Sequence, residues 1–473
     1  MPPQPNDTAQ VNFTSVPRKT WTAGTLTYTT SALVILFGWL LFGDFALQLK
    51  DRSDSVTAQI VLKKFEASNF LVGLIIGSIP AAIAMLVGPF ISVKSDRYRS
   101  RWGRRIPFLI LPLPVVVLSM FALAVSPLIG AWLHGFLGVN SPGPNVCVLI
   151  AFTFFWVLFE FSSAIIAILF GSLINDVVPQ EVIGRFFGFF RMVSLVAGIL
   201  FNTLLIKHVE THFFWIFVGT ALFYGIGFSM MCFMVKEGNY PPPEPLENVA
   251  SPGKFQGIRS YAKECFATPY YLWVFIALIF GGLSFSPLNS FSIFYAKSLE
   301  MSMELYGQYL SVSFAVSFVL AYFLGSLADR FHPLRLGIVS LVLYLLLSIC
   351  SALFVNSPSS FGFAFLTHTI IAGTYYTSMA SIGQRLYPKL KFAQFASAAG
   401  LLGSVFGLLL PPLMGLIIDA SGQNYRLTFV GGAIFSIISV LALLIVYHKF
   451  KQYGGPKNYV PPHASEPGAA SLT

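Results

Sequence analysis

Long runs of apolar residues with almost no charge recur along the whole chain. A bilayer core about 30 Å thick is crossed by roughly 20 apolar residues in a helix, because a helix satisfies every backbone donor and acceptor internally. The runs are solid rather than alternating, which argues against a β-barrel. The sequence therefore predicts an all-α membrane protein with twelve transmembrane helices, at about residues 26–49, 70–93, 106–130, 147–174, 186–206, 213–235, 270–295, 305–328, 336–354, 361–383, 393–418 and 427–447.

Composition excludes other classes. Only 10% of the 473 residues are charged and 55% are hydrophobic, whereas a soluble domain has about 25% charged residues. A water-soluble enzyme and a disordered chain are both excluded on these figures. The sequence also contains no glycine-rich phosphate loop, no paired histidines at metal-binding spacing and no nucleophile motif. We therefore expect no enzyme activity, no cofactor and no metal site.

Lysine and arginine positions predict the orientation. With the N-terminus inside, 22 of the 29 lysine and arginine residues fall on the cytoplasmic side. Both termini are therefore expected in the cytoplasm. The net charge of +10 is explained by this bias and by anionic lipid headgroups, so no nucleic-acid partner is expected. The polar amino end does not resemble a cleavable signal, which suits a plasma membrane or a bacterial inner membrane.

The chain divides into two similar halves. A polar, proline-rich stretch separates the sixth and seventh apolar runs. The triplet SDR at residues 95–97, after the second run, has a similar counterpart, ADR, at residues 328–330 after the eighth. Such repeats are typical of transporters with a site at the interface between halves. The predicted organisation is a cytoplasmic tail (1–25), a six-helix bundle (26–235), a cytoplasmic linker (236–267), a second six-helix bundle (268–450) and a cytoplasmic tail (451–473).

One loop carries a specific motif. Residues 94–108 (KSDRYRSRWGRRIPF) resemble the loop between the second and third helices of the major facilitator superfamily. The form of the motif is most similar to the sucrose/proton symporters and the glycoside-pentoside-hexuronide cation symporters. Residues 175–185 resemble the loop of the superfamily after its fourth helix, and residues 325–330 resemble the second-half repeat of the motif.

This resemblance implies a secondary transporter that moves a sugar or glycoside by alternating access. An aspartate at a helix end followed by arginines can also form pairs that hold one gate state and break in the other. The alternative is that these arginines only anchor the loop at the inner membrane surface. The expected gating residues are Asp96, Arg97, Arg104, Arg105, Asp176, Arg185, Asp329 and Arg330.

Glu160 lies about midway along the predicted fourth helix. A charged group at this depth is costly, so it is a functional candidate. Burial penalises the charged form of a carboxyl group, as suits a proton-coupling site. The alternatives are a protonated side chain bonding to a neighbouring helix, or a permanent pair with Arg191.

Asp44 and Gln48 lie one turn apart in the first helix and together form a hydrogen-bonding edge suited to sugar hydroxyls. The resemblance implies a cation or sugar ligand at Asp44. The alternative is a solvated residue at the outer mouth, unless the helix continues past Lys50. Arg191, with Asn202 on the same stripe of the fifth helix, is expected to face the cavity, to pair with a carboxylate or to reach the headgroups.

The carboxyl-terminal half carries polar groups without buried charge. Asn289 lies near Pro287, which is expected to interrupt the seventh helix, and Tyr375 lies in the tenth. Their alternative role is to bond neighbouring helices to one another. His368 is expected to be an ordinary interfacial histidine.

The sequence as a whole predicts a transporter of a sugar or glycoside, coupled to protons or another cation. The remaining alternatives are an exporter of another small molecule or drug, and a receptor or scaffold that does not transport.

Overall fold

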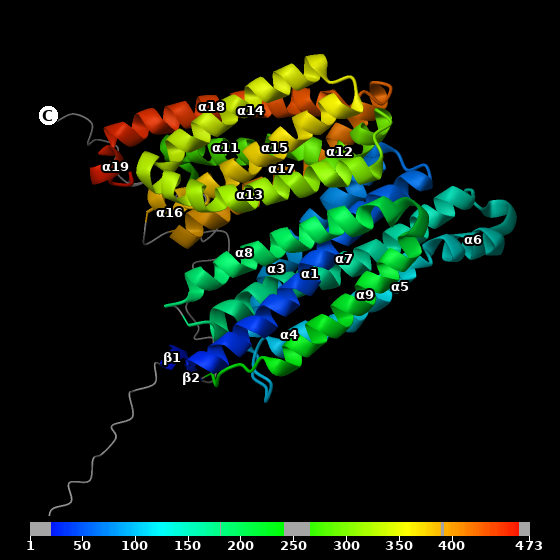
Figure 1. Ribbon diagram of the computed structural model, residues 1–473, viewed down its shortest axis with the longest axis horizontal. Helices are drawn as coiled ribbons and strands as arrows, with labels where there is room; N and C mark the ends of the chain where they lie inside the picture. Colours follow the sequence, from blue (N-terminus) through cyan, green and yellow to red (C-terminus); the bar gives the residue numbers. More distant parts are fainter. Residues whose placement is uncertain (1–19, 180, 241–264, 389–391, 463–473) are drawn as a thin grey trace, which may run out of the picture.

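The computed structural model describes residues 20–462 except 180, 241–264 and 389–391. Most of the chain is helical, and two groups of long helices lie side by side (Figure 1). Nine helical segments within the described residues are long and apolar enough to cross a membrane. The buried hydrophobic residues form two clusters. One fills the amino-terminal half and continues into helices of the carboxyl-terminal half between Leu288 and Phe429, and the other lies within the carboxyl-terminal half.

The amino-terminal half begins with a short hairpin whose strands pair antiparallel, with Thr20 opposite Thr29. The hairpin and the helices that follow are β1 (Thr20–Ala23), β2 (Leu26–Thr29), α1 (Thr30–Lys64), α2 (Asn69–Val72), α3 (Ile79–Arg97), α4 (Ile106–Ile110), α5 (Leu113–Ala124), α6 (Ser126–Leu137), α7 (Pro144–Val177), α8 (Ile183–Leu200) and α9 (Val209–Met234). Short π- and 3₁₀-helical turns continue some of them: η1 (Gly73–Ser78), η2 (Gly138–Asn140), η3 (Phe201–Leu205) and η4 (Ile206–His208).

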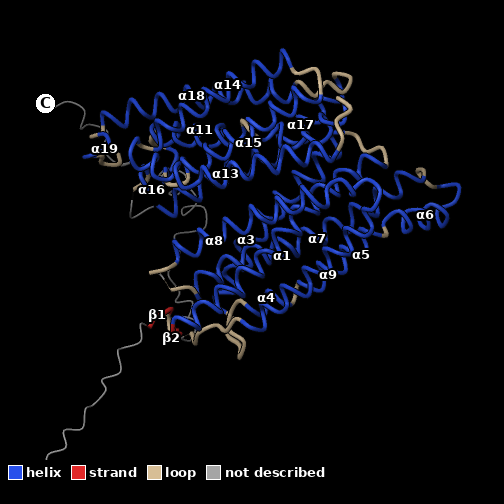
Figure 2. Tube along the Cα trace, in the orientation of Figure 1, coloured by secondary structure: helices blue, strands red, loops and turns tan. Residues whose placement is uncertain are grey.

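The carboxyl-terminal half repeats this arrangement with helices alone. They are α11 (Pro269–Leu283), α12 (Ser286–Ser298), α13 (Met303–Phe331), α14 (Pro333–Phe354), α15 (Pro358–Met379), α16 (Ile382–Leu386), α17 (Phe392–Ala420), α18 (Leu427–Gln452) and α19 (Gly455–Asn458). The tube in Figure 2 shows loops mainly at the two ends of the bundles. The break between α11 and α12 confirms the interruption predicted at Pro287, because proline cannot donate the backbone hydrogen bond that would continue the helix.

The first helix differs from the prediction. The sequence placed its end near residue 49, because charged residues begin at Lys50, but α1 continues to Lys64. The charges are accommodated because Lys50 and Asp54 pack inward against the rest of the half. The hairpin lies across the predicted boundary at residue 25, with one strand on each side of it. The third run, predicted to reach residue 130, instead divides at Val125 into α5 and α6.

The two halves are joined tightly near α2. Asn69 Nδ2 donates to Asp419 Oδ1 on α17 at 2.7 Å, and the backbone N–H of Phe70 donates to Asp419 Oδ2 at 3.0 Å. A carboxylate at the start of a helix is favoured by the helix dipole and by the free N–H groups there. Gly73 and Gly415 allow the backbones to approach, since a Cβ at Gly415 would lie 2.3 Å from the Asn69 carbonyl oxygen.

Candidate functional site

A buried lysine forms the centre of the amino-terminal half. Lys50 lies on α1 with only 1% of its side chain exposed. Its Nζ is 2.8 Å from Asp51 Oδ1 and 3.9 Å from Asp54 Oδ2, and it donates to Ser163 Oγ of α7 at 2.5 Å. An ammonium group removed from water in this way requires carboxylate and hydrogen-bonding partners, which α1 and α7 supply together.

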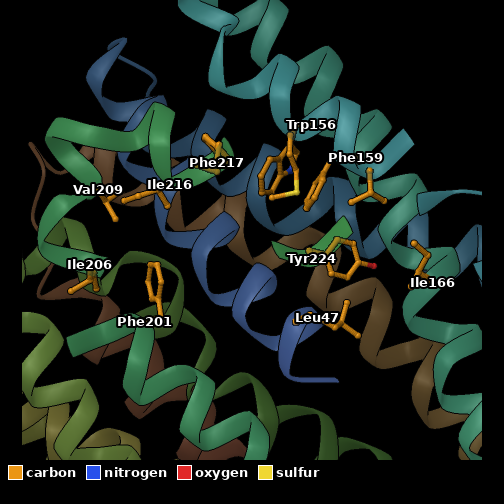
Figure 3. Packing of buried hydrophobic residues seen from close by; sticks show 14 of the residues in the cluster. Leu47, Trp156, Phe159, Ile166, Phe201, Ile206, Val209, Ile216, Phe217 and Tyr224 are labelled. Atoms are coloured by element: carbon orange, nitrogen blue, oxygen red, sulfur yellow. The ribbon is translucent and has the colours of Figure 1, made fainter. Parts of the chain in front are cut away.

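Aromatic rings surround the same ammonium group. Lys50 Nζ lies 4.6 Å from the centroid of the Phe159 ring and 5.5 Å from that of Tyr224. Figure 3 shows Phe159 and Tyr224 in the apolar region beside Leu47 of α1. The negative faces of aromatic rings stabilise a desolvated cation, so these rings hold Lys50 in place while excluding water.

Two carboxyl groups lie near Lys50 without hydrogen bonds of their own. Asp54 is 2% exposed, and neither of its carboxyl oxygens has a hydrogen-bond partner among the described residues. Glu160 follows Phe159 on α7 and interacts electrostatically with Lys50 and Asp51. The cation beside Glu160 is thus Lys50 rather than Arg191, so the alternative of a permanent Glu160–Arg191 pair is wrong.

The predicted pair Asp44 and Gln48 is formed. Asp44 is fully buried, which rules out a solvated position at the outer mouth. Gln48 Nε2 donates to Asp44 Oδ1 at 3.2 Å, and Ser194 Oγ of α8 donates to Gln48 Oε1 at 2.9 Å. Asp44 Oδ2 has no hydrogen-bond partner in the described part of the chain. This relay links α1 to α8. Asn202, which lies in η3 after the end of α8, is also buried.

Arg191 faces the other half of the molecule. It lines a small pocket together with residues of α13 and α15, among them Ser317, Thr374 and Thr377. Of the predicted positions for Arg191, the structure therefore shows the one between the halves. Arg52 of α1 lies nearby, with its guanidinium carbon 5.1 Å from the ring centroid of Phe314 on α13.

The carboxyl-terminal half contains a neutral polar network. His368 is completely buried, and its ring nitrogens contact the Tyr344 hydroxyl at 2.9 Å and Asn289 Oδ1 at 3.0 Å. The amide oxygen can only accept, so His368 Nε2 carries the proton and Nδ1 accepts from Tyr344. The ring of Phe285 packs between His368 and Tyr375, with its centroid 5.6 Å from that of Tyr375. The expectation of an interfacial position for His368 is wrong, because Tyr344 of α14, Asn289 of α12 and Phe285 surround it.

The first-half gating residues form a cluster at the opposite end from α2. Arg104 Nη2 donates to Asp176 Oδ1 at 2.6 Å, Arg105 Nε donates to Asp176 Oδ2 at 3.1 Å, and Arg105 also pairs with Asp96. The hydrogen bonds to Asp176 raise the pKa of the Arg104 guanidinium above its usual value. All of these partners belong to the amino-terminal half.

Glu237, which the sequence analysis did not single out, completes this cluster. Its carboxylate accepts from the backbone N–H groups of Arg104, Arg105 and Ile106 at 2.7 to 2.9 Å and so caps α4. Arg185 is exposed at the start of α8, outside the cluster, and Arg97 is exposed at the end of α3. Asp329 and Arg330 lie in α13, but their side chains fall outside the described residues.

Lys50, Asp51, Arg52 and Asp54 are candidate residues that sequence reasoning missed. The signal was present, because the apolar residues 56, 58, 60, 61 and 62 follow these charges without a proline or glycine to end the helix. These charges lie within one continuous helix, α1, and do not mark its end.

The fold and site define a class: a membrane protein of two similar helical bundles with charged groups at and near their interface. The model of the Major Facilitator Superfamily matches residues 21–411, and the chain belongs to this family. It is a transporter family, in agreement with the resemblance of residues 94–108. No curated protein matches the sequence.

Solved structures confirm the fold. A bacterial homologue of the human lysosomal transporter Spinster, inward-facing and unoccupied, aligns with a TM-score of 0.67 at 16% identity over 92% of this chain and 100% of that one. A D-xylose–proton symporter aligns with a TM-score of 0.60 at 15% identity, over 92% of this chain and 98% of that one. A bacterial homologue of the iron transporter ferroportin, also inward-facing, gives 0.64 at 14% identity over 88% and 99%.

Proposed function

We propose that the protein is a proton-coupled symporter of a sugar or glycoside that works by alternating access, with both termini in the cytoplasm. The observation that carries this proposal is a group of three acids in the amino-terminal half around or near Lys50. Asp44 and Asp54 are buried, and Glu160 is half-buried beside Lys50. A carboxyl group with so few fixed partners can exchange its proton when the nearby cation moves. A D-xylose–proton symporter among the structural neighbours supports the sugar and the proton, as does the motif of residues 94–108.

The contacts between halves support an inward-facing state. Two contacts join the halves: Asn69 donates to Asp419, and Thr203 Oγ1 lies 2.9 Å from Ser311 Oγ. In the predicted orientation, both contacts lie toward the outer side of the membrane. At the cytoplasmic end, the carboxylates of Asp176 and Glu237 bind groups of their own half. Alternating access then requires the Asn69–Asp419 contact to break when the outer side opens.

Uptake of radiolabelled mono- and disaccharides into proteoliposomes, with and without a proton gradient, tests this function. We expect uptake that an uncoupler abolishes in the wild type, and gradient-independent exchange that survives in Glu160→Gln. Glu304→Gln is the matched control, because Glu304 is exposed at the start of α13. Equal, uncoupler-insensitive accumulation by the wild type and Glu160→Gln would refute coupling through Glu160.

A further inference from the structure

An apolar groove on the outside of the amino-terminal half has no part in the proposed transport. It lies between α1 and α9, beside the turns η3 and η4, and has a volume of about 500 Å³, a size typical of ligand sites. Its walls include Leu49, Leu205, Ile216 and Phe223. Most of α9 lies on the side of the amino-terminal half that faces away from the carboxyl-terminal half (Figure 1). The groove therefore opens toward the surrounding lipid rather than toward the interface between the halves.

A kink in α9 and a glycine leave this space open. His212 has non-helical backbone angles, with φ −125° and ψ 29°, so α9 bends close to its start. Two turns further along, Gly219 lines the groove, and no described heavy atom lies within 4 Å of the position that its Cβ would take. The space thus begins at the backbone itself, where a side chain would otherwise stand.

Polar groups gather at one end of the groove. His208 of η4 and His212 both line it, their side chains are exposed, and their ring centroids lie 6.0 Å apart. Trp215 lines the groove one turn further along α9 and is 66% exposed. Tryptophan is enriched at the level of the lipid headgroups. The groove therefore has a polar end at the predicted membrane surface and an apolar interior that runs into the bilayer.

The charges beside the polar end favour an anionic group there. Glu210, the acid in the first turn of α9, lies 2.7 Å from Lys297 Nζ of α12 and is thus already paired with a cation. Lys207 is exposed on the turn that carries His208, and Lys64 Nζ lies 5.1 Å from the ring centroid of Phe213. Imidazole N–H groups can donate hydrogen bonds to phosphate oxygens. A ligand that matches the whole groove has an apolar chain joined to a phosphate.

We propose that this groove binds one chain of a membrane phospholipid, and that His208 and His212 hold the phosphate of its headgroup. In the predicted orientation, the lipid belongs to the outer leaflet. The headgroup lies beside the Glu210–Lys297 ion pair, which joins α9 of one half to α12 of the other. The site does not depend on which substrate the protein transports.

Titration of the purified full-length protein in detergent with phosphatidylglycerol that carries brominated chains tests the proposal, because bromine quenches tryptophan fluorescence on contact. We expect saturable quenching of Trp215, identified as the part that is lost in Trp215→Phe. Gly219→Leu places a side chain in the groove and should weaken binding about tenfold or more, since a few methylene contacts contribute that factor. Gly135→Leu is the matched control, because Gly135 is an exposed glycine of α6 with equally open surroundings, and it should leave binding unchanged.

A second pair of ligands tests the phosphate contact. Diacylglycerol with the same brominated chains lacks the phosphate and should bind about tenfold more weakly than the phospholipid, because it loses charged hydrogen bonds. The double variant His208→Ala with His212→Ala should reduce binding of the phospholipid to that level and leave binding of diacylglycerol unchanged. Melting temperatures of the variants would show that they are folded.

The proposal is overturned if Trp215 shows no saturable quenching, or if Gly219→Leu binds the phospholipid as tightly as the wild type. Equal binding of phospholipid and diacylglycerol would overturn the assignment of the phosphate to His208 and His212. Glycerol 3-phosphate carries the phosphate without chains and should not displace the lipid at equal concentration. Displacement would show an anion site rather than a lipid site, and would also overturn the proposal.

Discussion

The two halves share one architecture but bury different chemistry. The amino-terminal half encloses Lys50 with Asp54 and Glu160, whereas the carboxyl-terminal half encloses the neutral network of His368, Tyr344 and Asn289. Among the described residues, no lysine, arginine, aspartate or glutamate is buried in the carboxyl-terminal half. The repeat therefore preserves helix packing, while the buried charged side chains of the described residues lie in the amino-terminal half alone.

The largest expected effect tests whether charges in the amino-terminal half depend on one another. Lys50→Met should lower stability by about 3 to 5 kcal/mol, because removing one partner leaves buried carboxylates uncompensated. The double variant Lys50→Met with Asp54→Asn should recover much of that loss. Thermal unfolding of the purified variants measures both. Lys207→Met is the control and should change little, since Lys207 is exposed.

If Lys50 and Asp54 contributed independently to stability, the amino-terminal half would not contain a coupled group of charges, and this difference between the halves would disappear. If the double variant is no more stable than Lys50→Met alone, Asp54 and Lys50 do not act as a unit. The buried charges would then be separate features of packing rather than a coupled group.

Helix positions and the motif loop were predictable, because both depend on local sequence. Each of the predicted apolar runs falls on helix in the structure, although the ends of α1 and the division into α5 and α6 differ. The arginines of residues 94–108 predicted a cluster that the structure forms with Asp96 and Asp176. The inward packing of the charged residues in α1 was not predictable from hydropathy. Lys50 is tolerated only because Phe159, Ser163 and Tyr224, from two other helices, surround it.

The environment of His368 was unpredictable for a similar reason. In sequence it lies near the outer end of an apolar run, where histidines commonly contact headgroups. Its burial depends on Tyr344 and Asn289, which come from helices distant along the chain. Partners on other helices decide whether a polar residue is a site or a surface group, and spacing within one helix does not reveal them.

Substituting His368 in the neutral network of the carboxyl-terminal half should have a moderate effect on stability. His368→Phe should lower stability by about 1 to 3 kcal/mol, because the buried polar atoms of Tyr344 and Asn289 lose their partner. The pH profile of uptake should remain that of the wild type, in contrast to Glu160→Gln. Thermal unfolding and uptake at several pH values measure these effects, with Thr367→Val as an exposed neighbouring control. A shifted pH profile in His368→Phe would show that proton coupling extends into the carboxyl-terminal half.

The smallest expected effect concerns the loop between α13 and α14, the counterpart of the arginine-rich loop. Burial, with Arg385 and Arg335 nearby, lowers the pKa of His332 to about 4, and its Nδ1 accepts from the Leu334 N–H at 3.3 Å to cap α14. Because the unfolded chain binds this proton more readily, the contribution to stability is complete above about pH 6.5 and is lost as the pH falls toward 4. Solvent screening limits the loss to less than about 1 kcal/mol.

His332→Asn tests this difference between the loops. Asparagine tolerates the positive φ of 70° and can cap a helix without titrating, so this loss of stability between pH 6.5 and 4 should disappear. His448→Asn, which changes an exposed histidine of α18, should leave the loss in place. If both variants keep the wild-type pH dependence of unfolding, the loss does not come from His332. The contrast with the counterpart loop, in which the carboxylate of Glu237 caps the start of α4, would then have no effect on the pH dependence of stability.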